Sequence, residues 1–138
     1  MLLDKYMPIK LLKLKKFVNN NGTLVPVYLN KIKKFKLKRF FILYGKKKYF
    51  RSDHAHSKCS QIIIPLSGEI LIKIVSKNYI KKFRLNTKSK VAIYVPPYNW
   101  VTIYFKNNND SLLTLCNYKY DKKEYISLYK DFKKIISK

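Results

Sequence analysis

The sequence predicts an all-β domain, a barrel or a sandwich, followed by one short C-terminal helix. Short apolar runs rich in Ile, Val, Phe and Tyr recur about every ten residues between positions 39 and 116, which is typical of β-sandwiches and barrels. Polar turn segments separate these runs, for example at 76–78 and 107–110. Only the last segment of the chain has the apolar spacing of a helix.

The first part of the chain is predicted to be a strand hairpin followed by a charged connection. Residues 8–18 partly alternate apolar and basic side chains, which indicates a half-exposed strand. Asn-Asn-Asn-Gly at 19–22 is a hairpin turn signal, and residues 23–29 are the expected returning strand. After the lysine-rich residues 31–38, the apolar and aromatic run 39–44 predicts a buried strand.

The remaining strands are predicted from short runs bounded by turns. Residues 49–56 follow a Gly-Lys-Lys-Lys loop and end at a Ser-Lys turn. Pro65 gives the next strand an edge or bulge position, because proline cannot donate to a strand ladder. The other predicted strands are 61–66, 69–75, 80–85, 91–95, 101–105 and 112–116.

The tail, about residues 121–137, is predicted to be helical. Asp121 is the candidate N-cap, and Glu124 stands three residues later, as in a capping box. The apolar residues that follow recur at helical spacing, so they predict a stripe that packs against the outside of the barrel. This stripe consists of Tyr125, Leu128, Tyr129, Phe132, Ile135 and Ile136.

The sequence shows no linker or internal repeat, so residues 1–138 are expected to form a single domain. Its two cysteines, Cys59 and Cys116, have neither metal-ligand spacing nor the pattern of a disulfide framework. The N-terminal segment lacks the apolar core of a signal peptide, and no apolar run approaches the roughly 18 residues that span a bilayer. These features predict a cytoplasmic protein without a membrane partner.

The net charge of +24 first suggests a nucleic-acid or membrane partner. However, the basic residues are almost all lysines spread along the chain, and arginine occurs only at 39, 51 and 84. Recognition of base edges and phosphates favours the bidentate guanidinium of arginine. We therefore expect no nucleic-acid partner and a solvated surface that favours a phosphorylated small substrate. A basic β-barrel that binds nucleic acid is the alternative.

His54 and His56 are the only histidines, and on a strand they would share one face. Three interpretations compete: a structural pair, a metal site, and metal-free acid–base catalysis. A catalytic metal needs about three protein ligands. There is no third histidine, and the weak ligand Gln61 stands where a carboxylate would be expected. The pattern favours acid–base catalysis, with a metal-dependent enzyme as the alternative.

Other polar and aromatic residues are candidates for substrate binding near the histidines. Arg51 precedes His54 by three residues, and its permanent charge suits a phosphate or an oxyanion. Tyr44 ends the preceding strand, while Tyr98 and Trp100 follow a Pro-Pro pair and suit stacking on a sugar or a base.

Several motifs resemble those of a known enzyme family. His54-x-His56, Gln61 and Gly68 are similar to the first cupin motif, with glutamine in place of its glutamate. Three segments resemble, in order and spacing, the motifs of the sugar 3,4-ketoisomerases, cupins that act on dTDP-4-keto-6-deoxy-D-glucose. They are Arg51-Ser-Asp-His-Ala-His56 with Gln61, Pro96-Pro-Tyr-Asn-Trp100, and Tyr120-Asp-Lys-Lys-Glu-Tyr-Ile-Ser-Leu-Tyr-Lys-Asp-Phe132. The resemblance covers about residues 37 to 132.

The chain departs from that family pattern in three places. Ser52 stands in place of a glycine, and Val101 stands where the family usually has a histidine after the tryptophan. The turn at 76–78 is Ser-Lys-Asn in place of Asp-Asp-Gly. None of these changes touches the two histidines.

The resemblance implies a cupin, or jelly-roll, β-barrel that is a metal-free isomerase without cofactors. A C4 ketone and a C3 hydroxyl would exchange through an enediol(ate), with His54 serving the carbon-bound proton and His56 the oxygens. The implied partners are a dTDP-linked 4-keto-6-deoxy sugar and a second copy of the chain. In that homodimer the N-terminal strands, 8–29, would be exchanged. The expected substrate-binding residues are Tyr44, Arg51, Gln61, Tyr98 and Trp100.

Overall fold

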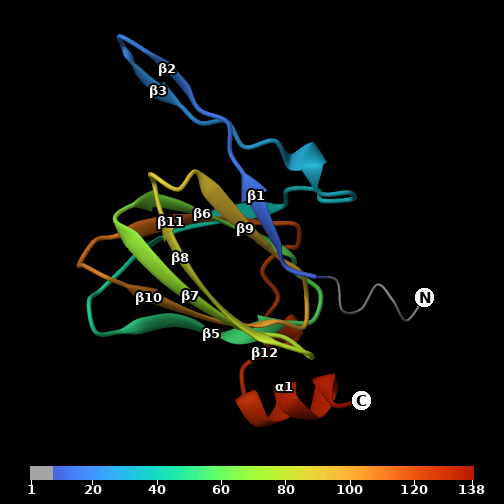
Figure 1. Cartoon of the computed structure of the whole chain (residues 1–138). Helices are drawn as coiled ribbons and strands as arrows, with labels where there is room; N and C mark the ends of the chain where they lie inside the picture. Colours follow the sequence, from blue (N-terminus) through green and yellow to red (C-terminus); the bar gives the residue numbers. More distant parts are fainter. Residues whose placement is uncertain (1–7) are drawn as a thin grey trace.

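Two antiparallel sheets of five strands each face one another and form a barrel in the computed structural model, which describes residues 8–138 (Figure 1). The strand orders are β1-β9-β6-β11-β4 and β12-β5-β10-β7-β8. A separate two-stranded sheet, β2-β3, projects away from the barrel, and the only α-helix of the described residues packs below β5 and β12 (Figure 1). The predicted cupin-type all-β class with a short C-terminal helix is confirmed.

The elements follow one another with short connections, as expected for antiparallel strands. In chain order they are β1 (Lys10–Lys13), β2 (Phe17–Asn19), β3 (Gly22–Leu24), η2 (Leu29–Lys31), β4 (Arg39–Tyr44), β5 (Phe50–His56), β6 (Gln61–Ser67), β7 (Glu69–Val75), β8 (Ile80–Asn86), β9 (Val91–Val95), β10 (Trp100–Phe105), β11 (Ser111–Cys116), η3 (Lys122–Glu124), β12 (Tyr125–Ile126) and α1 (Tyr129–Ile136).

The barrel interior is apolar because alternate residues of each strand point inward. On β7, Ile70, Ile72 and Ile74 are completely buried in one cluster with Val101 and Ile103 of β10. Burying each such side chain contributes roughly 1.5–3 kcal/mol. Residues of β5 that lie opposite Val101 and Ile103 therefore point into the barrel as well.

The lysine-rich connection before β4 covers the outer face of the first sheet. Its two buried apolar side chains, Ile32 and Phe35, pack on Ile62 and Ile64 of β6. The ring of Phe35 also meets the ring of Tyr94 edge to face, with centroids 6.4 Å apart. The lysines between these anchors remain exposed, so the segment is amphipathic rather than a free linker.

The N-terminal hairpin is shorter than predicted. The expected strand 8–18 is divided into β1 and β2, and only Gly22–Leu24 of the expected strand 23–29 is paired. Every residue of β2 and β3 is exposed, so no core contact supports a longer ladder. β1 instead joins the barrel, where it pairs with β9.

The tail also differs from the prediction of one helix over 121–137. Asp121 accepts a hydrogen bond from the backbone N–H of Lys123 and caps the 3-10 turn η3 rather than an α-helix. Tyr125 and Ile126 then pair with β5, and α1 begins only at Tyr129. Phe132 and Ile136 of the predicted stripe do pack against the outer face of the second sheet.

Candidate active site

A bulge in β5 decides which of its side chains face the interior. Arg51 pairs with the inward residue Ile103, and His54 pairs with the inward residue Val101. Two residues lie between Arg51 and His54, whereas only one lies between their partners, so the pairing shifts by one residue. Ser52 and Asp53 at the shift have left-handed backbone angles, with φ of 69° and 61°. The extra residue inverts the alternation, so Arg51, His54 and His56 share the interior face.

The two histidines lie against each other on the interior wall, as the sequence predicts for residues i and i+2. Their Nε2 atoms are 3.1 Å apart. The rings meet almost at right angles, with centroids 4.8 Å apart. His56 is the deeper residue, 6% exposed, and His54 is partly buried. This geometry allows a proton to pass directly from one imidazole to the other.

A buried carboxylate that the sequence analysis missed completes the pair. Glu124 is 2% exposed, and its Oε1 lies 2.5 Å from Nδ1 of His56. Its Oε2 accepts from the backbone N–H groups of Lys58, at 3.1 Å, and Cys59, at 3.3 Å. The capping-box interpretation assigned this residue to a local helix end, whereas its partners lie more than 60 residues earlier in the chain.

The pKa values of His54 and Glu124 are both lowered by their surroundings in the site. Burial, and then the neighbouring His56, hold the pKa of His54 below its ordinary value. Burial would raise the pKa of Glu124, but the hydrogen bond and charge of His56, with the two backbone N–H groups, lower it overall. Glu124 is therefore an anion near neutral pH and a partner for a protonated imidazole.

Gln61 connects the histidines to a buried pair of thiols. Its Nε2 lies 3.4 Å from Nε2 of His56 and donates to Sγ of Cys116 at 3.8 Å. A hydrogen bond from Cys59 and the charge of Arg39 outweigh burial and lower the pKa of Cys116 to about 7, whereas the pKa of Cys59 is raised. Both cysteines are free thiols.

One group of side chains has the composition of a metal site. Ligand atoms of His56, Cys59 and Glu124 lie within 4.8 Å of one another. Imidazole, thiolate and carboxylate together would suit Zn²⁺. However, both oxygens of Glu124 already accept hydrogen bonds, and the buried polar side-chain atoms of residues 8–138 all have partners. These side chains therefore form a hydrogen-bonded network in which each buried polar side-chain atom already has a partner.

Tyr125 also meets the histidines and is held by Arg39, although neither residue was predicted to belong to the site. The ring centroid of Tyr125 lies 4.8 Å from that of His54 and 4.4 Å from that of His56. Arg39 donates from Nη2 to the Tyr125 hydroxyl at 3.2 Å. Tyr125 was predicted to lie on a helical stripe, because the pairing of β12 with β5 has no local signature.

Two predicted binding residues lie on the histidine side of the molecule. Arg51 is exposed on the interior face, beyond the bulge from His54. The backbone N–H of Tyr98 donates to the carbonyl of His56 at 2.7 Å, which ties the loop before β10 to the end of β5. Val101, at the position of the family histidine, gives His54 an apolar neighbour.

The other two predicted binding residues are not brought to the histidines. Tyr44 is 69% exposed and pairs with Ser111, whereas the opposite end of β11, at Cys116, is the end beside Gln61. Trp100 is 5% exposed and points to the outer face, where it packs on Phe132 and donates from Nε1 to Asp53. Alternation along β10 explains this, since Val101 takes the inward position.

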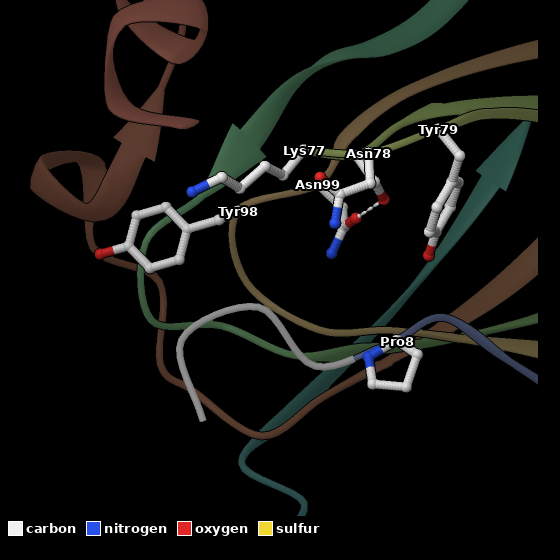
Figure 2. A pocket seen from close by; sticks show the side chains of 7 residues that line it. Pro8, Lys77, Asn78, Tyr79, Tyr98 and Asn99 are labelled. Atoms are coloured by element: carbon white, nitrogen blue, oxygen red, sulfur yellow. Dashed lines mark hydrogen bonds between the residues drawn. The ribbon is translucent and has the colours of Figure 1, made fainter. Parts of the chain in front are cut away.

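A hollow of about 200 Å³ lies at the same barrel end as the histidines, between the β7–β8 turn and the loop before β10 (Figure 2). The loop is held by Asn99, which donates from Nδ2 to the carbonyls of Pro96 and Pro97 and accepts from the hydroxyl of Ser76. Figure 2 shows Lys77 extended on the same side of the loop as Tyr98. The residues that line the hollow are Pro8, Ser76, Lys77, Asn78, Tyr79, Tyr98 and Asn99.

Fold and site together define a cupin-type barrel with a histidine pair on its inner wall. The sequence model of the FdtA family, described as "WxcM-like, C-terminal", matches residues 7–137, and the chain belongs to this family. Within residues 8–138, no helix is long and apolar enough to cross a membrane.

Relatives of known activity cover almost the whole chain. The TDP-4-oxo-6-deoxy-alpha-D-glucose-3,4-oxoisomerase of Aneurinibacillus thermoaerophilus is 30% identical over 94% of this chain and 93% of its own. The structure of the sugar 3,4-ketoisomerase QdtA from Thermoanaerobacterium thermosaccharolyticum in complex with TDP has 26% identity and a TM-score of 0.85, over 99% of this chain and 97% of that one. WlaRA, a TDP-fucose-3,4-ketoisomerase from Campylobacter jejuni, has 32% identity and a TM-score of 0.80, over 94% and 96%.

Proposed function

We propose that this protein is a sugar-nucleotide 3,4-ketoisomerase that converts dTDP-4-keto-6-deoxy-D-glucose to a dTDP-3-keto-6-deoxy-hexose. The observation that carries the proposal is the histidine pair on the barrel wall, with Nε2 atoms 3.1 Å apart. The Aneurinibacillus relative is a TDP-4-oxo-6-deoxy-alpha-D-glucose-3,4-oxoisomerase, and QdtA, a sugar 3,4-ketoisomerase, binds TDP. The proposed pathway role is the biosynthesis of unusual deoxyaminosugars.

The proposed reaction is two successive proton exchanges. In the first, a histidine takes the C3 proton while the C4 ketone oxygen receives a proton, which gives an enediol. In the second, the C3 hydroxyl proton leaves and C4 is protonated, which gives the 3-ketone and the 4-hydroxyl. We assign the carbon-bound proton to His54 and the oxygen shuttle to His56. The overall oxidation level of the sugar is unchanged, so the reaction needs no redox cofactor or metal.

For substrate binding we propose Arg51, Gln61 and Tyr98 together with the hollow beside Tyr98. Gln61 is 3.4 Å from His56 and suits a sugar hydroxyl. The polar lining of the hollow, with Lys77, suits part of the diphosphate or the nucleoside. Tyr44 and Trp100 point away from the histidines within this chain, so they are not included in the proposed site.

We also propose that the protein acts as a cytoplasmic homodimer without nucleic-acid or membrane partners. The two buried free thiols suit a reducing compartment. The projecting hairpin exposes Phe17, Val18 and Leu24, which a second copy would cover. An exchanged dimer would keep the β1–β9 register but take β1 from the partner. Light scattering measures the mass, and a monomer at assay concentration would contradict this proposal.

The activity is tested by incubating the protein with dTDP-4-keto-6-deoxy-D-glucose in D2O and recording NMR spectra. We expect a new 3-keto sugar that carries deuterium at C4. His54→Asn and His56→Asn should each abolish turnover with the fold intact, whereas the distant Tyr44→Phe should not. If neither product nor deuterium appears with the wild-type protein, the proposal is wrong. Turnover that is lost on chelation and restored by a metal would instead support a metal-dependent enzyme.

A further inference from the structure

We propose that Glu124 is the positioning residue of the histidine pair, and that it keeps a proton on Nδ1 of His56 so that the two Nε2 atoms share one proton. The inference deepens the proposed isomerase and rests on it only for its effect on turnover. The protonation state itself is a property of the substrate-free protein and can be measured there.

The contacts of Glu124 fix the position of the first proton. A carboxylate only accepts hydrogen bonds, and Oε2 is occupied by the backbone N–H groups of Lys58 and Cys59. Oε1 lies 2.5 Å from Nδ1 of His56. The proton between them therefore belongs to Nδ1, and Nε2 of His56 is left facing His54. Because these partners hold the carboxylate from two sides, the imidazole is fixed in both orientation and tautomer.

The position of His54 fixes the second and third protons. The backbone of Ser52 favours the protonated form of His54. Since Nε2 faces His56, we infer that Nδ1 of His54 carries the proton directed at this backbone. If both Nε2 atoms were unprotonated, their lone pairs would repel each other at 3.1 Å. One proton between them removes this repulsion and gives the pair a single positive charge opposite Glu124.

The surrounding groups agree with one shared proton and not two. The pKa of His54 is lowered by burial and by the charge of His56. Besides Glu124, the titratable or charged groups that influence the site are Asp53, Tyr125, Cys59, Cys116 and Arg39. Among residues 8–138, only Glu124 touches a ring nitrogen of the pair through a carboxylate.

A pair with one proton and one lone pair can act as acid and base in the same step. When it accepts the C3 proton and gives the shared proton to the C4 oxygen, it still carries one proton. The same count holds when it takes the proton of the C3 hydroxyl and protonates C4. Glu124 makes this possible because, without its charge, the neutral pair would have no acidic proton to give at the start.

The protonation state is tested by NMR of the substrate-free protein with 15N-labelled histidine. We expect both Nδ1 atoms to be protonated, one strongly downfield Nδ1–H signal from His56, and Nε2 shifts between those of protonated and free nitrogen. Two neutral imidazoles, or a His56 protonated only on Nε2, would overturn the inference. This measurement does not depend on turnover, so it separates the inference from the proposed function.

Variants test the positioning role. Glu124→Gln removes the charge, so kcat should fall by about 10²- to 10⁴-fold with little change in KM. The alkaline limb of the kcat/KM profile should move to lower pH, because the shared proton is lost more easily. Glu124→Asp should recover part of the activity and the downfield signal. The matched control is Glu69→Gln, since Glu69 forms a surface ion pair with Arg84.

Different outcomes would refute the positioning role of Glu124 and the proposed function. A folded Glu124→Gln protein with wild-type kcat and an unmoved pH profile would overturn the positioning role. If Glu124→Gln does not fold, the NMR spectrum of the wild-type protein and the profile of Glu124→Asp decide. A wild-type protein that shows the predicted NMR signals but does not turn over the sugar would refute the proposed function and leave the protonation state standing.

Discussion

Single residues set the geometry of this site, beginning with the two left-handed positions of the β5 bulge. Asp53 tolerates this backbone well, and its carboxylate accepts from Nε1 of Trp100 at 3.0 Å and from Oγ1 of Thr102 at 3.2 Å. Ser52, at φ 69°, has the less suitable side chain. A left-handed backbone costs a residue with a Cβ roughly 1–2 kcal/mol.

We therefore predict that Ser52→Gly stabilises the protein by up to about 1 kcal/mol, since glycine adopts a positive φ without that cost. Urea unfolding measures the change, as a shift of the midpoint with an unchanged m value. As a control, Ser67→Gly in β6, where φ is not positive, should destabilise. A Ser52→Gly protein less stable than wild type would show that the bulge is not strained at this position.

The titration of His54 and Glu124 predicts how stability depends on pH. The folded pKa of each group is lowered, so each stabilises the fold fully above its unfolded value and less as the pH falls toward its folded value. The free energy of unfolding should decline below about pH 6.5 as the unfolded histidine begins to bind protons. A second decline should follow below about pH 4.5, and Glu124→Gln should lack it. Unfolding curves that do not change between pH 8 and pH 5 would contradict this.

The sequence predicted the histidine pair because residues i and i+2 of any strand share a face. It could not predict Glu124, which reaches His56 from 68 residues away and was expected at a local helix cap. The placement of Arg51 on the face of His54 also depends on a non-local feature. On a regular strand these residues would point to opposite faces, and only the bulge brings them together.

At the scale of elements, helix α1 supports the site from outside the barrel. Helix α1 is short, so tertiary packing supplies its stability. Phe132, completely buried, lies under Ala55 and Trp100. Ala55 stands between the two histidines in sequence and points to the opposite face, so the helix packs directly behind the histidine pair.

We predict that Phe132→Ala lowers the free energy of unfolding by about 3–5 kcal/mol, because it leaves a cavity behind β5. Leu128→Ala is the matched control: Leu128 is 54% exposed and should change stability little. Thermal unfolding followed by circular dichroism gives both values. An equal Tm for the two variants would show that α1 is not anchored through Phe132.

The tail shows why propensity predicted a helix where the protein forms three elements. Asp121, Glu124 and the apolar spacing are all local features, and each is compatible with a helix. Tertiary contacts take precedence: the Glu124 side chain binds β5 and the loop after it, and Tyr125–Ile126 add a strand to the same sheet. Only the part after Leu128 remains free to be helical.

At the scale of the whole molecule, the charge of +24 should act on association with an anionic sugar nucleotide. We predict that raising the KCl concentration from about 0.05 M to 0.5 M lowers kcat/KM, because salt screens the attraction between the surface lysines and the anionic substrate. The value of kcat should stay nearly constant, since the buried histidine pair is little affected. A salt-independent kcat/KM would show that the surface charge has no role in binding the substrate.

The barrel as a whole was predictable because its strands repeat one simple pattern of short apolar runs and polar turns. The N-terminal hairpin was less so, because its apolar residues, such as Phe17 and Leu24, are exposed and do not join the core. A repeating pattern identifies a strand, but it does not tell whether another layer covers it.

The distance in sequence between His56 and Glu124 also governs when the site can form during synthesis. The ribosome completes β1 to β11, up to Cys116, before it adds the segment that carries the carboxylate. A nascent chain with β1 to β11 in place therefore lacks the counter-charge of its histidines until residue 124 has been added. A chain cut short before residue 124 lacks this carboxylate and β12, so its histidine pair has no buried counter-charge.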